Sequence, residues 1–145
     1  MVLRTVGRTR ALRYNPMIKF LERNREFAII FLVLIALGIF FVSTIPGNNI
    51  DAGGFDLSKA YHFIVFFLLN FFLLVTLTGK NKIKTKHVFL SIFISVIYAV
   101  LDEIHQMFVP FRSPDIGDIL IDSIGIFVSV IVYFYSKKSE KQDVF

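Results

Sequence analysis

The stretch at residues 102–122, DEIHQMFVPFRSPDIGDILID, decides the fold, because charged residues crowd there into a chain whose other long runs are apolar. Its centre, VPFRSP at residues 109–114, carries two prolines, and proline removes a backbone donor and clashes inside a helix. A carboxylate well inside a bilayer costs about 2.5–3.5 kcal/mol on insertion scales. These carboxylates therefore need partners, and we expect the stretch to form the functional centre.

The composition predicts a membrane protein. Of the 145 residues, 55% are hydrophobic and 18 are Phe, and much of this material falls in runs of about 20, the length that crosses a hydrocarbon core of about 30 Å. The absence of cysteine excludes disulfides and thiolate metal sites. We predict an all-α, polytopic bundle of four transmembrane helices, with spans at residues 27–45, 58–78, 87–108 and 116–135.

The distribution of basic residues predicts the orientation. Fourteen of the sixteen Lys and Arg residues lie in a segment before the first span, in the loop between the second and third, and in the tail; the other two are Lys59 and Arg112. By the positive-inside rule, residues 1–26 form a basic cytoplasmic segment, residues 27–135 the membrane domain, and residues 136–145 a cytoplasmic tail. Residues 102–122 then face outward.

Helical phase brings the polar residues together. At about 100° per residue, polar residues form one stripe on each of the last three spans, and polar stripes in a membrane turn toward each other or toward water. We therefore expect an outward-facing polar cavity, lined by Lys59, His62, Asp102, Glu103, Gln106, Arg112, Asp118 and Asp122.

Several interpretations of this cavity stay open. Arg112, Lys59 and His62 could simply neutralise the carboxylates as ion pairs between helices. Some acidic side chains could instead extend to the membrane–water interface without taking part in a site. Alternatively the cavity binds a ligand or catalyses a reaction, since ionisable residues within membranes commonly mark functional sites. The candidates for catalysis are Glu103, His62 and Asp122, with His62 as a general base oriented by a carboxylate.

Two further expectations concern charge pairing. We expect Arg112 to fold back over the cavity and to pair with Glu103, Asp118 or Asp122, because it lies on a proline-bounded loop between two acidic helix ends. The carboxylates of the cavity and His62 are also suitable cation ligands. Their spacing along the chain matches no recognised metal motif, so we expect no metal and no cofactor.

Particular residues follow the pattern of a known family. The second half of the chain carries a Glu with a Gln three residues later, an aromatic-x-Pro-x-Arg turn, an Asp, and a Gly on the last helix: Glu103, Gln106, Phe108, Pro110, Arg112, Asp118 and Gly125. The second span begins with Lys59 and a His62–Phe63 pair, and the first ends with STIPG at residues 43–47. Over residues 27–135 the chain thus resembles the VanZ-like family of bacterial membrane proteins. Four positions depart from the pattern: Ser58 for Asp, Phe66 for Tyr, Phe111 for Gly and Asp122 for Asn.

The resemblance implies a multi-pass protein of the bacterial inner membrane. Its best-known member contributes to resistance against teicoplanin-type glycopeptides. We therefore expect the cavity to bind a lipid-linked or headgroup ligand and to contribute to glycopeptide resistance or envelope homeostasis. The alternative is an intramembrane hydrolase or transferase that acts on a polar lipid head. The expected partners are membrane lipids, with a lipid-linked cell-wall precursor or a glycopeptide as further candidates, and no nucleic acid.

Cysteine labelling tests the predicted orientation. The chain has no cysteine of its own, so single cysteines at positions 51 and 82 report without background. A membrane-impermeant reagent added to intact cells should label position 51 and leave position 82 unlabelled. Labelling at 82 with none at 51 contradicts the orientation.

Overall fold

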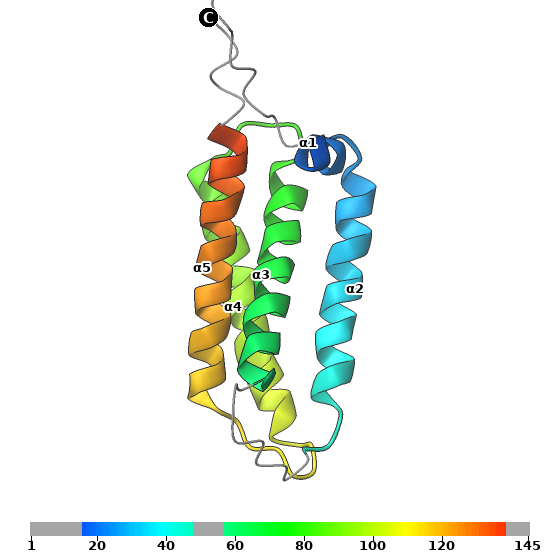
Figure 1. Cartoon of the computed structure of the whole chain (residues 1–145), viewed down its shortest axis with the longest axis vertical. Coiled ribbons are helices and arrows are strands. Elements are labelled where there is room, and N and C mark those ends of the chain that lie inside the picture. Colours follow the sequence, from blue (N-terminus) through cyan, green and yellow to red (C-terminus); the bar gives the residue numbers. More distant parts are fainter. Residues whose placement is uncertain (1–15, 48–56, 139–145) are drawn as a thin grey trace, which may run out of the picture.

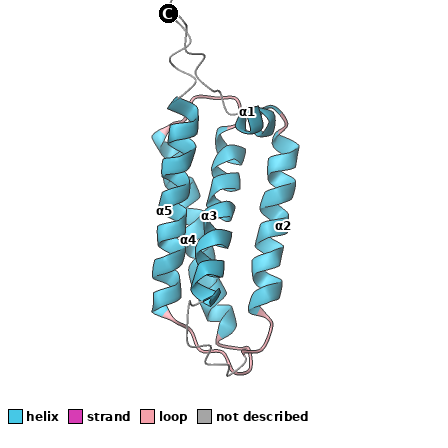
Figure 2. Ribbon diagram, viewed as in Figure 1, coloured by secondary structure: helices cyan, strands magenta, loops and turns pink. Residues whose placement is uncertain are grey.

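The computed structural model describes residues 16–47 and 57–138, which are helical apart from short connections (Figures 1 and 2). Most of the predicted basic segment and of the predicted tail lies outside the described residues. The helices are α1 (Pro16–Arg23), α2 (Arg25–Ser43), α3 (Leu57–Thr78), α4 (Thr85–Gln106) and α5 (Ile116–Lys138). Helices α2 to α5 are each long and apolar enough to cross a membrane, which confirms the predicted four-helix membrane bundle.

The four spans differ from the sequence prediction only at their ends. Helix α4 ends at Gln106, two residues early, because Pro110 prevents further helix and the chain turns tightly before it. Helix α2 ends at Ser43 rather than at residue 45, since the residue before Pro46 disfavours helical backbone. Helix α5 continues to Lys138, three residues beyond the predicted end.

Helix α1 was not predicted. It lies across the end of the bundle and is seen end-on in Figure 1. Ile18 and Leu21 are buried in a cluster with residues of α2, α3 and α5. The carboxylate of Glu22 accepts a hydrogen bond from Tyr133 Oη at 2.8 Å and pairs with Lys137 Nζ at 2.7 Å. Because charged residues interrupt this eight-residue helix, it showed no apolar run by which the sequence could reveal it.

Helix α3 occupies the centre of the bundle and contacts α2, α4 and α5. A glycine permits its close approach to α5, because a Cβ at Gly125 would lie 2.5 Å from the carbonyl oxygen of Phe63. Small residues serve this purpose in membrane helix packing, where backbone approach replaces the hydrophobic effect. Large apolar side chains on all four long helices point outward, as expected for lipid-facing surfaces.

A polar network crosses the middle of the bundle. Asn70 Nδ2 on α3 donates to the carbonyl oxygen of Ile126 (3.2 Å) and to Ser129 Oγ (2.6 Å) on α5. Ser95 Oγ on α4 donates to Asn70 Oδ1 at 3.1 Å. Since hydrogen bonds between membrane helices contribute about 0.6 kcal/mol each on average, the network modestly stabilises the packing of three helices. It also confirms that the polar stripes of α3 and α5 face each other.

A tight turn joins α4 to the connection that leads to α5. Arg112 N donates to the carbonyl oxygen of Val109 at 3.2 Å, Pro110 follows Val109, and Phe111 has a φ of 60°. These are the features of a type II turn, whose third residue needs positive φ and therefore favours glycine. Gly47 N donates to Pro110 O at 3.2 Å, and a Cβ at Gly47 would overlap the carbonyl oxygen of Phe111. The turn thus packs directly on the chain that follows α2.

The positive φ of Phe111 predicts a stabilising substitution. A left-handed backbone conformation costs a residue with a Cβ about 1–2 kcal/mol. The free energy of unfolding of the Phe111→Gly variant should therefore be higher than that of the Phe111→Ala variant by about 1 kcal/mol. The comparison with alanine removes the effect of the phenyl ring, which is largely exposed. Thermal unfolding of the purified variants in one detergent measures the difference. A glycine variant no more stable than the alanine variant contradicts the assigned turn.

Candidate functional site

The predicted site residues gather at one end of the bundle, where α2 and α4 end and α3 and α5 begin. We call this the polar end. The loop at residues 107–115 and the chain following α2 meet there, on the opposite side from α1 (Figure 1). The sequence predicted a single cavity, but the structure divides the polar residues into two clusters.

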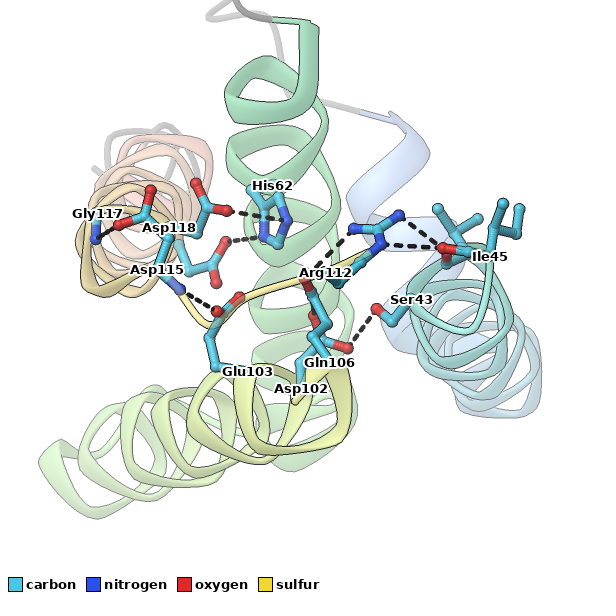
Figure 3. Close-up of polar contacts among 12 residues, drawn as sticks. Ser43, Ile45, His62, Asp102, Glu103, Gln106, Arg112, Asp115, Gly117 and Asp118 are labelled. Atoms are coloured by element: carbon cyan, nitrogen blue, oxygen red, sulfur yellow. Dashed lines mark hydrogen bonds and ion pairs between the residues drawn. The ribbon is translucent and has the colours of Figure 1, made fainter. Parts of the chain in front are cut away.

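The first cluster surrounds His62 on α3, which is only 3% exposed. Its Nδ1 lies 3.1 Å from Oδ1 of Asp122 on α5, and its Nε2 lies 3.7 Å from Oδ2 of Asp118, one turn earlier (Figure 3). Because an ionised carboxylate only accepts hydrogen bonds, the shorter contact fits an Nδ1–H donor. Asp122 is fully buried, so its carboxylate has lost its hydration, and the hydrogen bond from the imidazole of His62 compensates for this loss.

Glu103 enters the same cluster from α4. Its Oε2 accepts a hydrogen bond from the backbone N–H of Asp115 at 2.7 Å, which ties the end of α4 to the start of α5. Its Oε1 is buried and has no hydrogen-bond partner among the described residues, and the same holds for Oδ2 of Asp122. One ligand atom each from His62, Glu103 and Asp118 lies within 4.8 Å of the others. We call His62, Glu103, Asp118 and Asp122 the histidine cluster.

The second cluster lies between α4 and α2. Ser43 Oγ donates to Asp102 Oδ1 at 2.5 Å, and Gln106 Nε2 donates to Asp102 Oδ2 at 3.1 Å. Gln106 Oε1 in turn accepts from Arg112 Nη1 at 3.3 Å. Asp102 precedes Glu103 by about 100° around the helix, and this rotation directs the two carboxylates to different neighbours. We call Ser43, Asp102, Gln106 and Arg112 the arginine cluster.

Arg112 folds back over the bundle as expected, but its predicted partners are wrong. Its Nε donates to the carbonyl oxygen of Ile45 at 3.0 Å, and its Nη2 donates to that of Val42 at 3.4 Å. The end of a helix leaves carbonyl groups without intrahelical partners, and the turn aims the guanidinium at these acceptors. Among the described residues it forms no ion pair with any of the three carboxylates proposed from the sequence: Glu103, Asp118 and Asp122.

Two adjacent pockets open at the polar end. The larger, of about 410 Å³, is lined by charged and polar side chains and by the loop: Gly47, Ser58, Lys59, Gln106, Phe111, Arg112, Ser113, Asp115 and Asp118. The smaller, of about 250 Å³, has a more apolar lining: Val42, Ser43, Leu57, Ser58, Tyr61, His62 and Arg112. Ser58 and Arg112 line both, so a polar chamber adjoins one suited to an apolar group.

Ser43 and Gly47 were not among the predicted site residues, although both belong to the STIPG motif on which the resemblance partly rests. Ser43 lies at the end of an apolar run, and nothing along the chain indicates that it binds Asp102. Gly47 acts through its lack of a Cβ, which lets it lie directly against Phe111, a loop residue 64 positions later in the sequence. His105 packs against the neighbouring helix α2, where the centre of its ring lies 4.8 Å from that of Phe40.

Comparison with protein families identifies the chain. The family model described as VanZ/LLP1 matches residues 17–137. The chain belongs to the VanZ/LLP1 family. The match extends from α1 into the last turn of α5, so the VanZ/LLP1 domain includes α1, which the resemblance noted from sequence left out. Searches among curated proteins and among solved structures each found no match.

Proposed function

We propose that this VanZ/LLP1 protein binds a membrane lipid with an anionic headgroup in the pocket at the polar end. The observation that carries the proposal is the 410 Å³ pocket, which Lys59 and Arg112 line and which adjoins the more apolar pocket. Its volume is within the range of small-molecule sites, about 300–1,000 Å³. A polar chamber beside an apolar one matches a molecule that has a charged head and a hydrocarbon tail.

The cationic side chains suit a phosphate-bearing head. Lys59 presents a compact charge at the pocket wall, and arginine recognises phosphate through its planar set of donors. A guanidinium has five N–H donors, and Val42, Ile45 and Gln106 engage three of those of Arg112. The other two N–H groups supply hydrogen bonds to a headgroup oxygen. Arg112 therefore both shapes the wall and contributes to binding.

The proposed orientation places this pocket on the outer side of the bacterial inner membrane, with both termini in the cytoplasm. The charge distribution supports it, since the described Lys and Arg residues other than Lys59 and Arg112 lie at the other end of the bundle. A lipid-linked cell-wall precursor is one lipid of the required chemistry that is found on that side. Binding such a lipid would alter envelope homeostasis and susceptibility to teicoplanin-type glycopeptides, as the family resemblance suggests.

A second candidate function is a hydrolase or transferase that acts on a polar lipid head. The observation that favours it is the His62–Asp122 contact of 3.1 Å, the arrangement of a general base and its orienting carboxylate. His62 also lines the smaller pocket, and Glu103 approaches His62 from α4 as the candidate general acid. This candidate predicts turnover of the lipid, whereas the first predicts binding alone.

Lipid retention tests the proposed function. The Lys59→Gln variant removes a pocket charge while keeping a polar side chain of similar length. After purification of the full chain, mass spectrometry should find anionic lipid reduced about fivefold or more relative to the unaltered protein, since one close charge contact to a phosphate contributes about 1 kcal/mol or more. The matched control is Lys82→Gln, which changes the same charge at the opposite end of the bundle and should retain lipid normally.

Equal lipid retention in both variants, at equal abundance, contradicts the proposed binding site. A cell-based assay complements the measurement: Lys59→Gln should change teicoplanin susceptibility and Lys82→Gln should not. Mass spectrometry of the same samples also detects any cleaved lipid. Cleaved lipid that is present with the unaltered protein and absent with the His62→Gln variant would favour an enzymatic function over binding alone.

A further inference from the structure

We propose that His62, Glu103 and Asp118 bind a divalent metal ion of the Zn²⁺ or Mn²⁺ class. The three residues come from α3, α4 and α5, and one ligand atom of each lies within 4.8 Å of the others. Figure 3 shows their side chains pointing toward a shared space. This metal site deepens the proposed function. It rests on that function in one respect only, namely that the lipid headgroup completes the coordination of the ion.

The orientation of His62 is that of a metal ligand. Its Nδ1 is engaged by Asp122 at 3.1 Å, so its Nε2 is directed at Asp118 Oδ2, 3.7 Å away. That distance is too long for a hydrogen bond. Two atoms that each lie about 2.1 Å from one ion are about 3–4 Å apart. A carboxylate that accepts from the non-ligating nitrogen is the usual companion of a metal-binding histidine, and Asp122 occupies that position.

The carboxylate of Glu103 provides an independent indication. The side chain is only 3% exposed, yet its Oε1 has no hydrogen-bond partner among the described residues. Leaving a buried charged acceptor without a donor is costly, and a bound cation would compensate for it. Its Oε2 is held by the backbone N–H of Asp115 at 2.7 Å, which fixes the plane of the carboxylate. Metal-ligating carboxylates are hydrogen-bonded in this manner.

The charge balance of the polar end also favours a cation. Among its described residues the permanent cations are Lys59 and Arg112, and the carboxylates are Asp102, Glu103, Asp115, Asp118 and Asp122. Carboxylates in excess would repel an anionic headgroup, and two positive charges from an ion would offset them. The ion therefore makes the pocket more compatible with the lipid proposed above.

Three protein ligands leave at least one coordination position open. Catalytic zinc sites likewise have three protein ligands, with the remaining position taken by water or substrate. Imidazole suits Zn²⁺ and related ions, and carboxylates suit Mn²⁺ as well, so the donor set indicates this class. Asp118 lines the larger pocket and His62 the smaller, which gives the ion an entry path and places its open position beside the headgroup.

The experiment uses the full chain purified in detergent, with any affinity tag removed and bound metal stripped by a chelator. Zn²⁺ or Mn²⁺ alone is titrated by calorimetry, without added lipid. We expect about one ion per chain, and an affinity lowered about tenfold or more by Glu103→Gln. Glutamine keeps the shape of the side chain and an acceptor for Asp115 N. The matched control is Glu26→Gln, the same change at an exposed carboxylate at the opposite end of the bundle, and it should leave ion affinity within about threefold.

Electron spin echo spectroscopy of bound Mn²⁺ gives a second measurement, which needs no variant of Glu103. A nitrogen coupling from a coordinated imidazole is expected in the unaltered protein and should vanish in His62→Gln. The proposal is overturned by absence of saturable ion binding, by unchanged affinity in Glu103→Gln, by equal losses in the two carboxylate variants, or by absence of the nitrogen coupling.

The outcomes of the two proposals are separable. Ion binding is measured without lipid, and the lipid test changes Lys59, which is not one of the three proposed ligands. If the protein binds the ion but Lys59→Gln retains normal lipid, the lipid proposal fails and the metal site stands. If lipid binding depends on Lys59 while no ion binds, the metal site fails alone.

Discussion

A carboxylate on a membrane-crossing helix must find its partner on another helix, and this constraint determines how the bundle is assembled. Asp122 on α5 is fully buried, and the imidazole of His62 on α3, 3.1 Å away, is the group that compensates it. The pairing places α3 and α5 side by side. Gly125 lets their backbones approach, and Asn70 joins the two helices again near the middle of the bundle.

The sequence predicts the four membrane spans well, because such spans are recognisable by length and hydropathy and their polar stripes by phase. It does not predict how the polar end divides. Asp102 and Glu103 are adjacent in sequence, yet about 100° of rotation sends one to Ser43 on α2 and the other toward His62. Arg112 was assigned carboxylate partners because charges are visible in a sequence. Its actual acceptors are the side-chain oxygen of Gln106 and two backbone carbonyl groups, which every residue has and which only the fold can place.

The two clusters have different physical consequences. The arginine cluster is satisfied by hydrogen bonds, and with the turn of Pro110 and Phe111 against Gly47 it fastens the loop to the end of α2. The histidine cluster is not fully satisfied, since Glu103 and Asp122 each keep a buried oxygen without a donor among the described residues. Both the lipid and the metal proposals start from this arrangement, a hydrogen-bonded wall beside carboxylates whose charge is not fully compensated.

The central claim is that pairing between α3 and α5 holds the polar end together, and a double-mutant cycle tests it most directly. Free energies of unfolding are measured in bicelles for the unaltered chain, His62→Ala, Asp122→Ala and the double variant. The account predicts a coupling energy between the two sites of about 0.5–3 kcal/mol, as found for residues in contact. A cycle of His62→Ala with the distant Lys82→Ala should be additive. Additivity of His62→Ala with Asp122→Ala would contradict the account.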